Sequence, residues 1–169
     1  MRAVVLGAAA LFASSVSASA VKPTGEWAVP GNVAHLHIAD CDGRLWGVVS
    51  WERRPSADSH NPDPAKRSRP MLGVPILLGM KRAQPNRWDG EIYNANNGKI
   101  YTADIRLTGA DVLHVEGCFL GFLCGGQDWT RIKPTTVRYD PLQADPSPID
   151  ASVAKRMICS SVRRKERNP

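Results

Sequence analysis

Beyond its first 20 residues, the sequence has no apolar run long enough to cross a bilayer, which takes about 20 residues. It also has no Gly-x-Ser-x-Gly elbow, no His-Glu-x-x-His helix and no phosphate-binding glycine loop. No Cys-x-x-Cys pair is present, which argues against a structural zinc site. We therefore expect no membrane span, no metal, no cofactor and no catalytic residues. Members of a catalytic triad that lie far apart in the sequence would escape this search, so an enzyme remains the less favoured alternative.

The chain has a net charge of +6, which is unevenly placed. Residues 134–169 hold seven Lys and Arg against four Asp and Glu, whereas residues 21–133 hold fourteen against twelve. A domain that binds nucleic acid carries a basic face, so the nearly neutral body argues against nucleic acid as a partner. The sequence does not predict an oligomeric state.

The first twenty residues have the pattern of a secretory signal peptide. Arg2 supplies the positive start, Ala3 to Ala13 is apolar and uncharged, and Ala18-Ser19-Ala20 matches a cleavage site. An uncleaved N-terminal anchor is the alternative. We expect a mature chain that starts near Val21, is periplasmic or secreted, and is long enough for one domain.

The four cysteines of an exported protein are expected to form disulfides. Four cysteines allow three pairings. Cys118 and Cys124 flank Phe-Leu-Gly-Phe-Leu, as the two ends of a hairpin would, so we favour a bridge between them. Cys41 and Cys159 would then tie the C-terminal tail to the body.

The pattern of residues 21–133 predicts about eight short strands separated by tight turns. The segment 99–107 alternates clearly, with Tyr101, Ala103 and Ile105 on one face and Thr102 and Asp104 on the other. Turns every 8–12 residues are typical of a β-sandwich or barrel, and sequential hairpins favour a closed up-and-down barrel without exposed edges. We predict an all-β fold with strands at 25–29, 33–39, 45–51, 73–80, 88–93, 99–107, 112–117 and 127–132.

The C-terminal residues 134–169 differ in composition from the body. Residues 139–148 carry three prolines and predict a linker. Ser147 and Pro148 then suit the cap and first position of a short helix. Its apolar stripe would hold Ile149, Val153, Met157 or Ile158, and Val162, and the chain ends in a basic segment.

A polar segment, Asp58 to Gly73, separates two of the predicted strands. Its residues 61–66 could form one capped helical turn, because Asn and Asp favour caps and Pro favours the first turn. Arg67 and Arg69 lie close in sequence to Asp58, Asn61 and Asp63. We favour a self-bonded structural loop, and the alternative is an anion site at the mouth of the barrel.

His35 and His37 lie on one face of a predicted strand. Two histidines at that spacing can bind a metal, but no third ligand is evident. We therefore expect both side chains to be solvated.

Several short motifs occur in a fixed order along the body: Gly25-x-Trp27, Asn61-Pro-Asp63 running into Arg67-Ser-Arg69-Pro70-x-Leu-Gly73, Trp88-x-Gly90-x-Ile-Tyr93, Gly98-x-x-Tyr101, and Trp129-Thr-Arg131. Together they resemble the bacterial domain-of-unknown-function family 2147, over roughly residues 24–133. This resemblance implies a lipocalin-like β-barrel and no established activity. The chain departs from the family at Trp46, where a Cys or small residue is common, and in its added tail.

The same motifs suggest how one end of the barrel closes. Lipocalin-type barrels pair a Gly-x-Trp in the first strand with an Arg in the last, here Gly25 and Trp27 with Trp129 and Arg131. A guanidinium can stack on an indole and donate to nearby carbonyls. Binding of an anionic ligand by Arg131 is the alternative.

The favoured function is binding of a small apolar or amphipathic molecule. A barrel cavity of roughly 300 Å³ or more, lined by Trp and aliphatic side chains, would support it, and an interior filled solid by side chains would remove it. The alternative is an envelope protein-interaction or structural module that acts through the polar segment and the basic tail. The candidate ligand-binding residues are Asp58, Asn61, Asp63, Arg67, Arg69, Trp88, Tyr93 and Tyr101.

Overall fold

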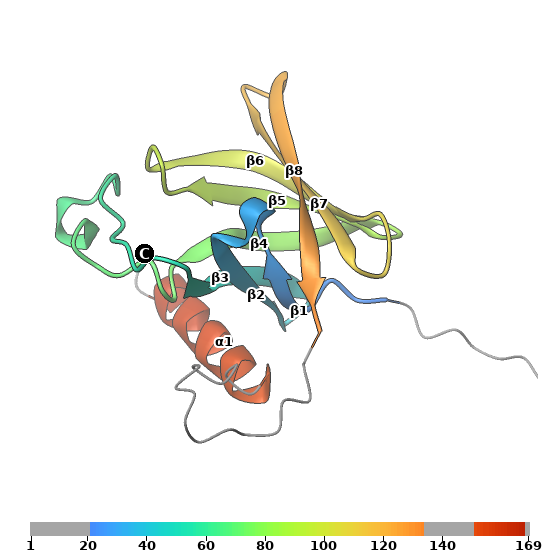
Figure 1. Cartoon of the computed structure of the whole chain (residues 1–169), viewed down its shortest axis with the longest axis horizontal. Helices are drawn as coiled ribbons and strands as arrows, with labels where there is room; N and C mark the ends of the chain where they lie inside the picture. The colour runs from blue at the N-terminus through green and yellow to red at the C-terminus, as the bar shows by residue number, and fades with distance from the viewer. Residues whose placement is uncertain (1–20, 134–150, 168–169) are drawn as a thin grey trace, which may run out of the picture.

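The computed structural model describes residues 21–133 and 151–167 (Figure 1). The predicted signal peptide and linker lie outside these residues. The body is a closed antiparallel barrel in which each strand pairs with its neighbours in sequence and β1 pairs with β8. The predicted fold class is therefore confirmed. The strands are β1 (Gly25–Ala28), β2 (Ala34–Cys41), β3 (Arg44–Glu52), β4 (Pro75–Gln84), β5 (Arg87–Asn94), β6 (Lys99–Leu107), β7 (Val112–Phe119) and β8 (Leu123–Ile132).

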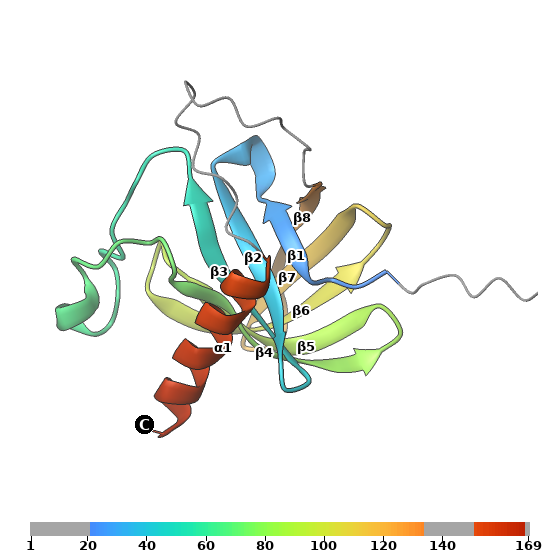
Figure 2. The ribbon, with the colours of Figure 1, turned by 90° about the horizontal axis from the view of Figure 1, so that it is seen from below.

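Up-and-down pairing puts alternate connections at opposite ends of the barrel. One end, which we call the loop end, carries residues 29–33, 53–74, 95–98 and 120–122, with the short 3₁₀ turns η1 (Pro30–Asn32) and η2 (Pro64–Lys66). The other end, which we call the closed end, carries the tight turns at 42–43, 85–86 and 108–111 and the start of β1. The long segment 53–74 thus lies at the loop end (Figure 2).

Strand boundaries differ from the sequence prediction at β4 and β8. β4 runs from Pro75 to Gln84 instead of 73–80, and its register shifts between Leu78 and Lys81, as expected for a bulged strand that contains a proline. β8 starts at Leu123 instead of 127, because the ladder with β7 continues outward through Cys118 and Cys124. The β7–β8 hairpin is therefore longer than predicted.

Large apolar side chains fill the middle of the barrel. Trp27, Ile38, Leu77, Met80 and Ile105 are completely buried, and they belong to one contiguous cluster with residues of every strand. Side chains with no solvent-accessible surface leave no water-sized space against them. The expected cavity lined by Trp and aliphatic residues does not occupy this section of the barrel.

Helix α1 (Ala151–Arg167) packs on the outside of the barrel against β2 (Figure 2). Ala39 and Cys41 contact Ile158, Cys159 and Val162 in a small apolar cluster, to which Trp46 and Val48 add. The helix is longer than the short one predicted. Of the two alternatives for its stripe, Ile158 is buried and Met157 is 59% exposed.

Two disulfides join the described cysteines. Cys41 and Cys159 connect the end of β2 to α1, across 118 residues of sequence. Cys118 and Cys124 are direct cross-strand partners in the β7–β8 hairpin, with their Cα atoms 4.0 Å apart. One bridge therefore anchors the tail and the other closes the hairpin below its tip.

Within the described residues, no helix combines the length and apolar character that a membrane crossing requires.

Candidate functional site

The closed end is built on the predicted tryptophan and arginine. Trp27 and Arg131 are direct partners on β1 and β8, and the guanidinium carbon lies 4.1 Å from the ring centroid. Arg131 also donates to the carbonyl oxygens of Lys22, Thr24 and Ala110 at 2.7–2.9 Å. The Trp27 indole N–H donates to the Pro23 carbonyl at 2.8 Å. These contacts join the last strand, β8, to the start of the first strand, β1, and to the β6–β7 turn, so they support a structural role for Arg131.

The polar segment 53–74 is organised around one completely buried carboxylate, Asp58. One of its oxygens accepts from the Tyr93 hydroxyl at 2.5 Å. The other accepts from the Asn61 amide at 2.7 Å and from Arg69 Nη2 and Nε at 2.7 and 3.0 Å. The residue thus ties the segment to β5 through Tyr93, on the side of the strand that faces away from the core.

The rest of the segment is held by its own polar groups. Asp63 caps η2 by accepting from the Ala65 N–H at 3.0 Å, which confirms the predicted capped turn. Arg67 Nε donates to the Asn61 carbonyl at 2.9 Å. At Gly98 in the β5–β6 turn, φ is +69° and a Cβ atom would collide with the His60 carbonyl. Glycine is therefore required where the segment packs against this turn.

Two opposing effects set the charge state of Asp58. Burial raises the pKa of this carboxyl, but the hydrogen bonds from Tyr93, Asn61 and Arg69 outweigh burial and hold the pKa below its usual value. Burial and the nearby carboxylate together raise the pKa of Tyr93, which keeps its hydroxyl protonated as a donor. The cluster is thus an ionised carboxylate with all of its donors supplied by the chain.

The candidate ligand-binding residues do not form one site. Asp58, Asn61, Arg69 and Tyr93 bond to one another, and Asp63 and Arg67 complete the same loop. Trp88 lies in the core cluster. Only Tyr101 lies on the inner face of the barrel near the loop end, where its hydroxyl accepts from Asn97 at 2.8 Å.

An apolar stripe on the inner face of β7 and β8 runs from the core out into solvent. Cross-strand partners share a face, so its steps are Leu113 with Trp129, Val115 with Gln127, Gly117 with Gly125, and Phe119 with Leu123. Leu113 and Trp129 are buried, whereas Phe119 is 46% and Leu123 60% exposed. The outer half of the stripe thus presents an apolar surface with little covering it.

Neighbouring strands extend this surface sideways. Ile92 and Tyr101 are partners on β5 and β6, and both lie next to Gly117, whose added Cβ would come within 3.1 Å of Ile92 Cγ2. The Tyr101 and Phe119 rings meet edge to face with centroids 6.1 Å apart. Together Ile92, Tyr101, Gly117, Phe119 and Gly125 form what we call the inner wall.

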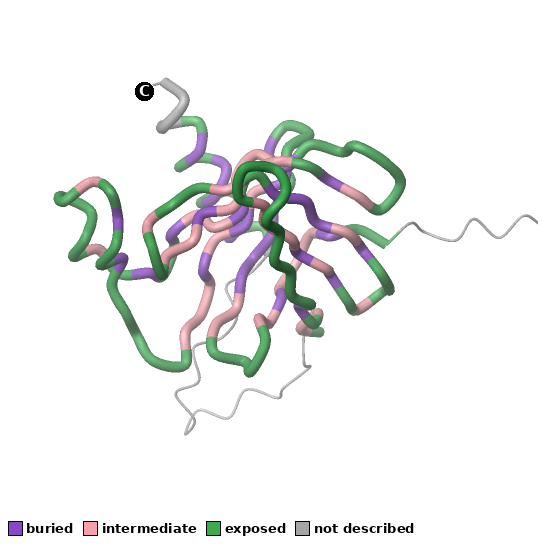
Figure 3. Tube along the Cα trace, turned by 90° about the horizontal axis from the view of Figure 1, so that it is seen from above, coloured by how far each residue is buried: buried purple, intermediate pink, exposed green. Residues whose placement is uncertain are grey.

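The opposite side of the barrel leaves the inner wall open. β1 has only four residues and pairs with β8 at Thr130, Arg131 and Ile132 alone. Residues 123–128 of β8 are all exposed, and an added Cβ at Gly125 would meet nothing within 4 Å. Figure 3 shows the hairpin tip and the first half of β8 as one exposed segment. The Trp129 indole N–H, at the buried end of the stripe, has no hydrogen-bond partner within the described part of the chain.

A second polar cluster lies on the outer face of β1, β2 and β3. The Ser50 hydroxyl donates to one Glu26 oxygen, and His37 Nδ1 lies 2.9 Å from the other. His37 is buried, so the prediction that it is solvated was wrong: pairing with Glu26 makes its burial tolerable. Burial raises the pKa of Glu26, but the contacts with His37 and Ser50 outweigh burial and lower it. Because His37 contacts the carboxylate and not the hydroxyl, this is no nucleophile–base pair.

Among the described residues, Glu116, Cys118 and Cys124 lie close enough together to be considered as metal ligands. Both cysteines are in a disulfide and offer no thiolate. This group therefore gives no support to a metal site.

A shallow groove of about 330 Å³ lies between the β2–β3 turn and α1. Asp40 and Asp42 line one side of it, and Lys155, Arg156 and Arg163 line the other. Arg163 Nη1 reaches Asp42 at 3.5 Å. The basic residues of the tail thus face acidic residues of the barrel, consistent with docking of α1 onto the barrel.

Comparison with known proteins agrees with this architecture. A family model described as "Uncharacterized protein conserved in bacteria (DUF2147)" matches residues 25–131. The chain belongs to this family. No match is found among curated proteins. Among solved structures, the chain is similar to "Protein HP1028 from the human pathogen Helicobacter pylori", which "belongs to the lipocalin family". The two share 16% identity with a TM-score of 0.62, over 80% of this chain and 98% of the other, and this likeness concerns the fold alone.

The sequence analysis missed Gly117, Phe119 and Gly125 as candidate site residues. Their signal was present: a run of large apolar residues occupied a predicted turn, where polar residues are usual. The two glycines became informative only when the register placed them opposite each other on the inner face.

Proposed function

We propose that the protein binds one small apolar or amphipathic molecule against the inner wall at the loop end. One observation carries this proposal: the apolar stripe of β7 and β8 continues past the filled core and ends in solvent-exposed Phe119 and Leu123. Exposed apolar surface in continuity with a core is the kind of surface on which ligands bind. An exported, disulfide-linked chain with a lipocalin-like fold is compatible with such a role.

The geometry restricts the ligand. Because the middle of the barrel is filled, the molecule would lie on the wall near the rim instead of deep in the interior. Its apolar part would contact Ile92, Tyr101 and Phe119, over the flat floor that Gly117 and Gly125 provide. Gln127 and the Tyr101 hydroxyl offer polar groups at the edges of the wall. A single acyl or isoprenoid chain with a small polar head fits this description.

A space-filling substitution tests the proposal. Gly125→Phe would add a ring where a Cβ meets nothing within 4 Å, so it should block the wall without disturbing the core. Gly109→Phe is the matched control, because a Cβ there also meets nothing, but Gly109 lies in the β6–β7 turn at the closed end. Titration of each protein with oleate, followed by native mass spectrometry, would measure binding.

The expected result is a loss of about tenfold or more in oleate affinity for Gly125→Phe and no change for Gly109→Phe. Native mass spectrometry of wild-type protein isolated from its own envelope should also show a retained small molecule. Equal oleate binding by both variants would mean that the inner wall is not the binding surface.

A further inference from the structure

The tip of the β7–β8 hairpin combines two energetically unfavourable features: large apolar side chains in contact with water, and a leucine in a left-handed backbone conformation. Leu120 and Phe122 are each 71% exposed. Leu120 also has a φ of +54°, in a turn closed by a hydrogen bond from the Phe122 N–H to the Phe119 carbonyl. Asn or Gly is usual at such a position. A large apolar side chain there improves neither solubility nor turn formation, which points to a contact outside the chain.

The tip is uncharged and held together covalently. Residues 117–127 contain no Asp, Glu, Lys or Arg. The Cys118–Cys124 bridge lies directly below the apolar residues Phe119 to Leu123 and joins the two strands. The bridge limits the splaying of the hairpin, so the two strands stay together directly below the exposed tip. Such a tip can insert into an apolar phase without unfolding.

One loop at this end, the segment 53–74, is basic. Residues 53–74 hold five Lys and Arg against two Asp, and the three other loops carry no charged side chain. Asp58 pairs with Arg69, and Asp63 pairs with Lys66. In the described part of the chain, Arg53, Arg54 and Arg67 are left without an acidic partner, and the exposed Lys99 begins β6 beside the tip strand β7.

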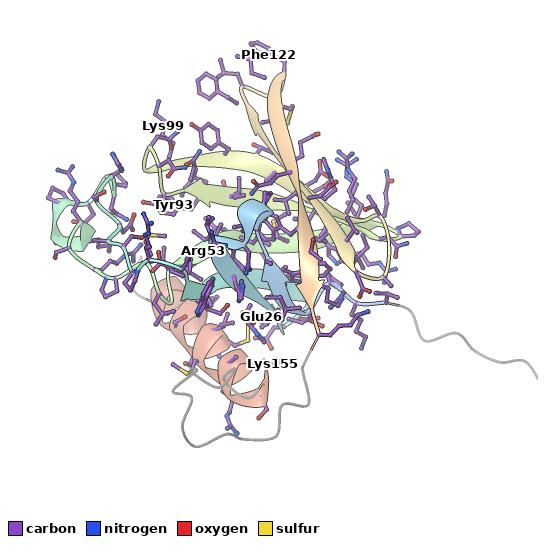
Figure 4. All side chains as sticks on the ribbon, viewed as in Figure 1. Glu26, Arg53, Tyr93, Lys99, Phe122 and Lys155 are labelled. Carbon is purple, nitrogen blue, oxygen red and sulfur yellow. A yellow bond between two sulfur atoms is a disulfide. The ribbon has the colours of Figure 1, made fainter. Side chains whose placement is uncertain are left out.

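The apolar tip and the basic segment 53–74 lie on one side of the molecule. In Figure 1 the β7–β8 tip, the β5–β6 turn and the segment 53–74 lie along the upper left of the view, and α1 runs below the segment 53–74, away from the tip. Figure 4 shows Phe122 and Lys99 on that same side. A flat surface could therefore touch all three loops together.

We propose that this side docks onto the surface of an anionic phospholipid bilayer, with Leu120 and Phe122 inserted among the acyl chains near the headgroups. Arg53, Arg54, Arg67 and Lys99 would then face the phosphate groups. The arrangement of an apolar anchor beside basic residues is the one by which peripheral proteins bind membranes, where neither term alone suffices. The proposal does not depend on the binding of a ligand by the inner wall.

Vesicle binding tests this proposal with ligand-free protein. The mature chain, with both disulfides intact, is mixed with vesicles of phosphatidylethanolamine and phosphatidylglycerol and then sedimented. The Leu120→Ser/Phe122→Ser double variant should lower the partition coefficient by about tenfold or more. Met157→Ser, at a position 59% exposed on α1, is the control and should bind as the wild type does. The Arg53→Gln/Arg54→Gln variant should bind anionic vesicles more weakly and with a shallower salt dependence.

Sedimentation velocity without lipid distinguishes a membrane from a second copy of the chain. A monomeric wild type that binds vesicles, together with a double variant that does not, supports the proposal. Absence of vesicle binding by the wild type, or equal binding by the double variant, would overturn it. A wild-type dimer that the double variant converts to monomers, with unchanged vesicle binding, would assign the tip to self-association instead.

Discussion

Replacing Asp58 is the most direct test of how much its hydrogen bonds stabilise the polar segment 53–74. Asp58→Ala removes the acceptor of four hydrogen bonds. The Tyr93 hydroxyl is buried and would lose its acceptor, which costs about 1–3 kcal/mol. The buried Asn61 amide would lose its shorter hydrogen bond and keep the longer one to the Tyr93 oxygen at 3.3 Å. Arg69 is about one-third exposed, so water can solvate part of its charge and its loss is smaller. We expect the free energy of unfolding to fall by about 3–5 kcal/mol, the range for a broken buried ion pair.

The same carboxylate predicts a pH dependence. Its pKa in the folded protein is below the value of about 3.9 expected in the unfolded chain. Stabilisation by Asp58 is therefore complete above the unfolded pKa and disappears as the pH falls through the folded pKa. Asp58→Asn keeps the shape but has no charge to lose, so the difference in stability between wild type and this variant should shrink as the pH is lowered below about 4.

Urea unfolding at neutral and acidic pH measures both effects. Asp63→Ala is the control, because its carboxylate is 42% exposed and serves only the cap of η2 and an exposed ion pair with Lys66, so the loss of stability should be clearly smaller. Arg69→Lys should rescue Arg69→Ala poorly, since an ammonium cannot reproduce the two hydrogen bonds that the planar guanidinium directs to one Asp58 oxygen. A loss below about 1 kcal/mol for Asp58→Ala, or a pH-independent difference for Asp58→Asn, would refute this reasoning. Anion-dependent melting in the wild type that Arg69→Ala abolishes without loss of stability would restore the anion-site alternative.

Two further predictions concern the closed end and the disulfides. Trp27→Ala should lower the free energy of unfolding by about 3–5 kcal/mol, because it opens a core cavity and removes the surface on which Arg131 stacks. Thermal unfolding measures this loss, and a value below about 1 kcal/mol would show that Trp27 does not close the barrel. Peptide mapping of the oxidised protein should recover only Cys118–Cys124 and Cys41–Cys159. Replacing Cys41 and Cys159 with serines should weaken the docking of α1 and lower the free energy of unfolding by about 2–5 kcal/mol. An unchanged melting temperature would contradict the role of this bridge as an anchor.

Local signals in the sequence determined the strands and turns of the body. Alternation along residues 99–107 placed Tyr101, Ala103 and Ile105 on one face, because side chains on a strand alternate between faces, and in the structure this face is the inner one. The turn residues separated eight strands at hairpin spacing, and consecutive hairpins close most simply as an up-and-down barrel. The capped turn at η2 was equally local, since it needs only Asp63 and the residues that follow it.

Contacts between distant residues were decided by the tertiary structure. The sequence placed Asp58 in a self-bonded loop, but its hydrogen bond from the hydroxyl of Tyr93, 35 positions later, came only with the tertiary structure. His37 became buried because Glu26, on another strand, meets it across the β1–β2 ladder. The start of β8 contains Gly125 and Gly126, which have low strand propensity, so only pairing with β7 makes it a strand. The turn at Pro30–Asn32 ends β1 locally, but only the pairing of β1 with residues 130–132 of β8 leaves the inner wall open.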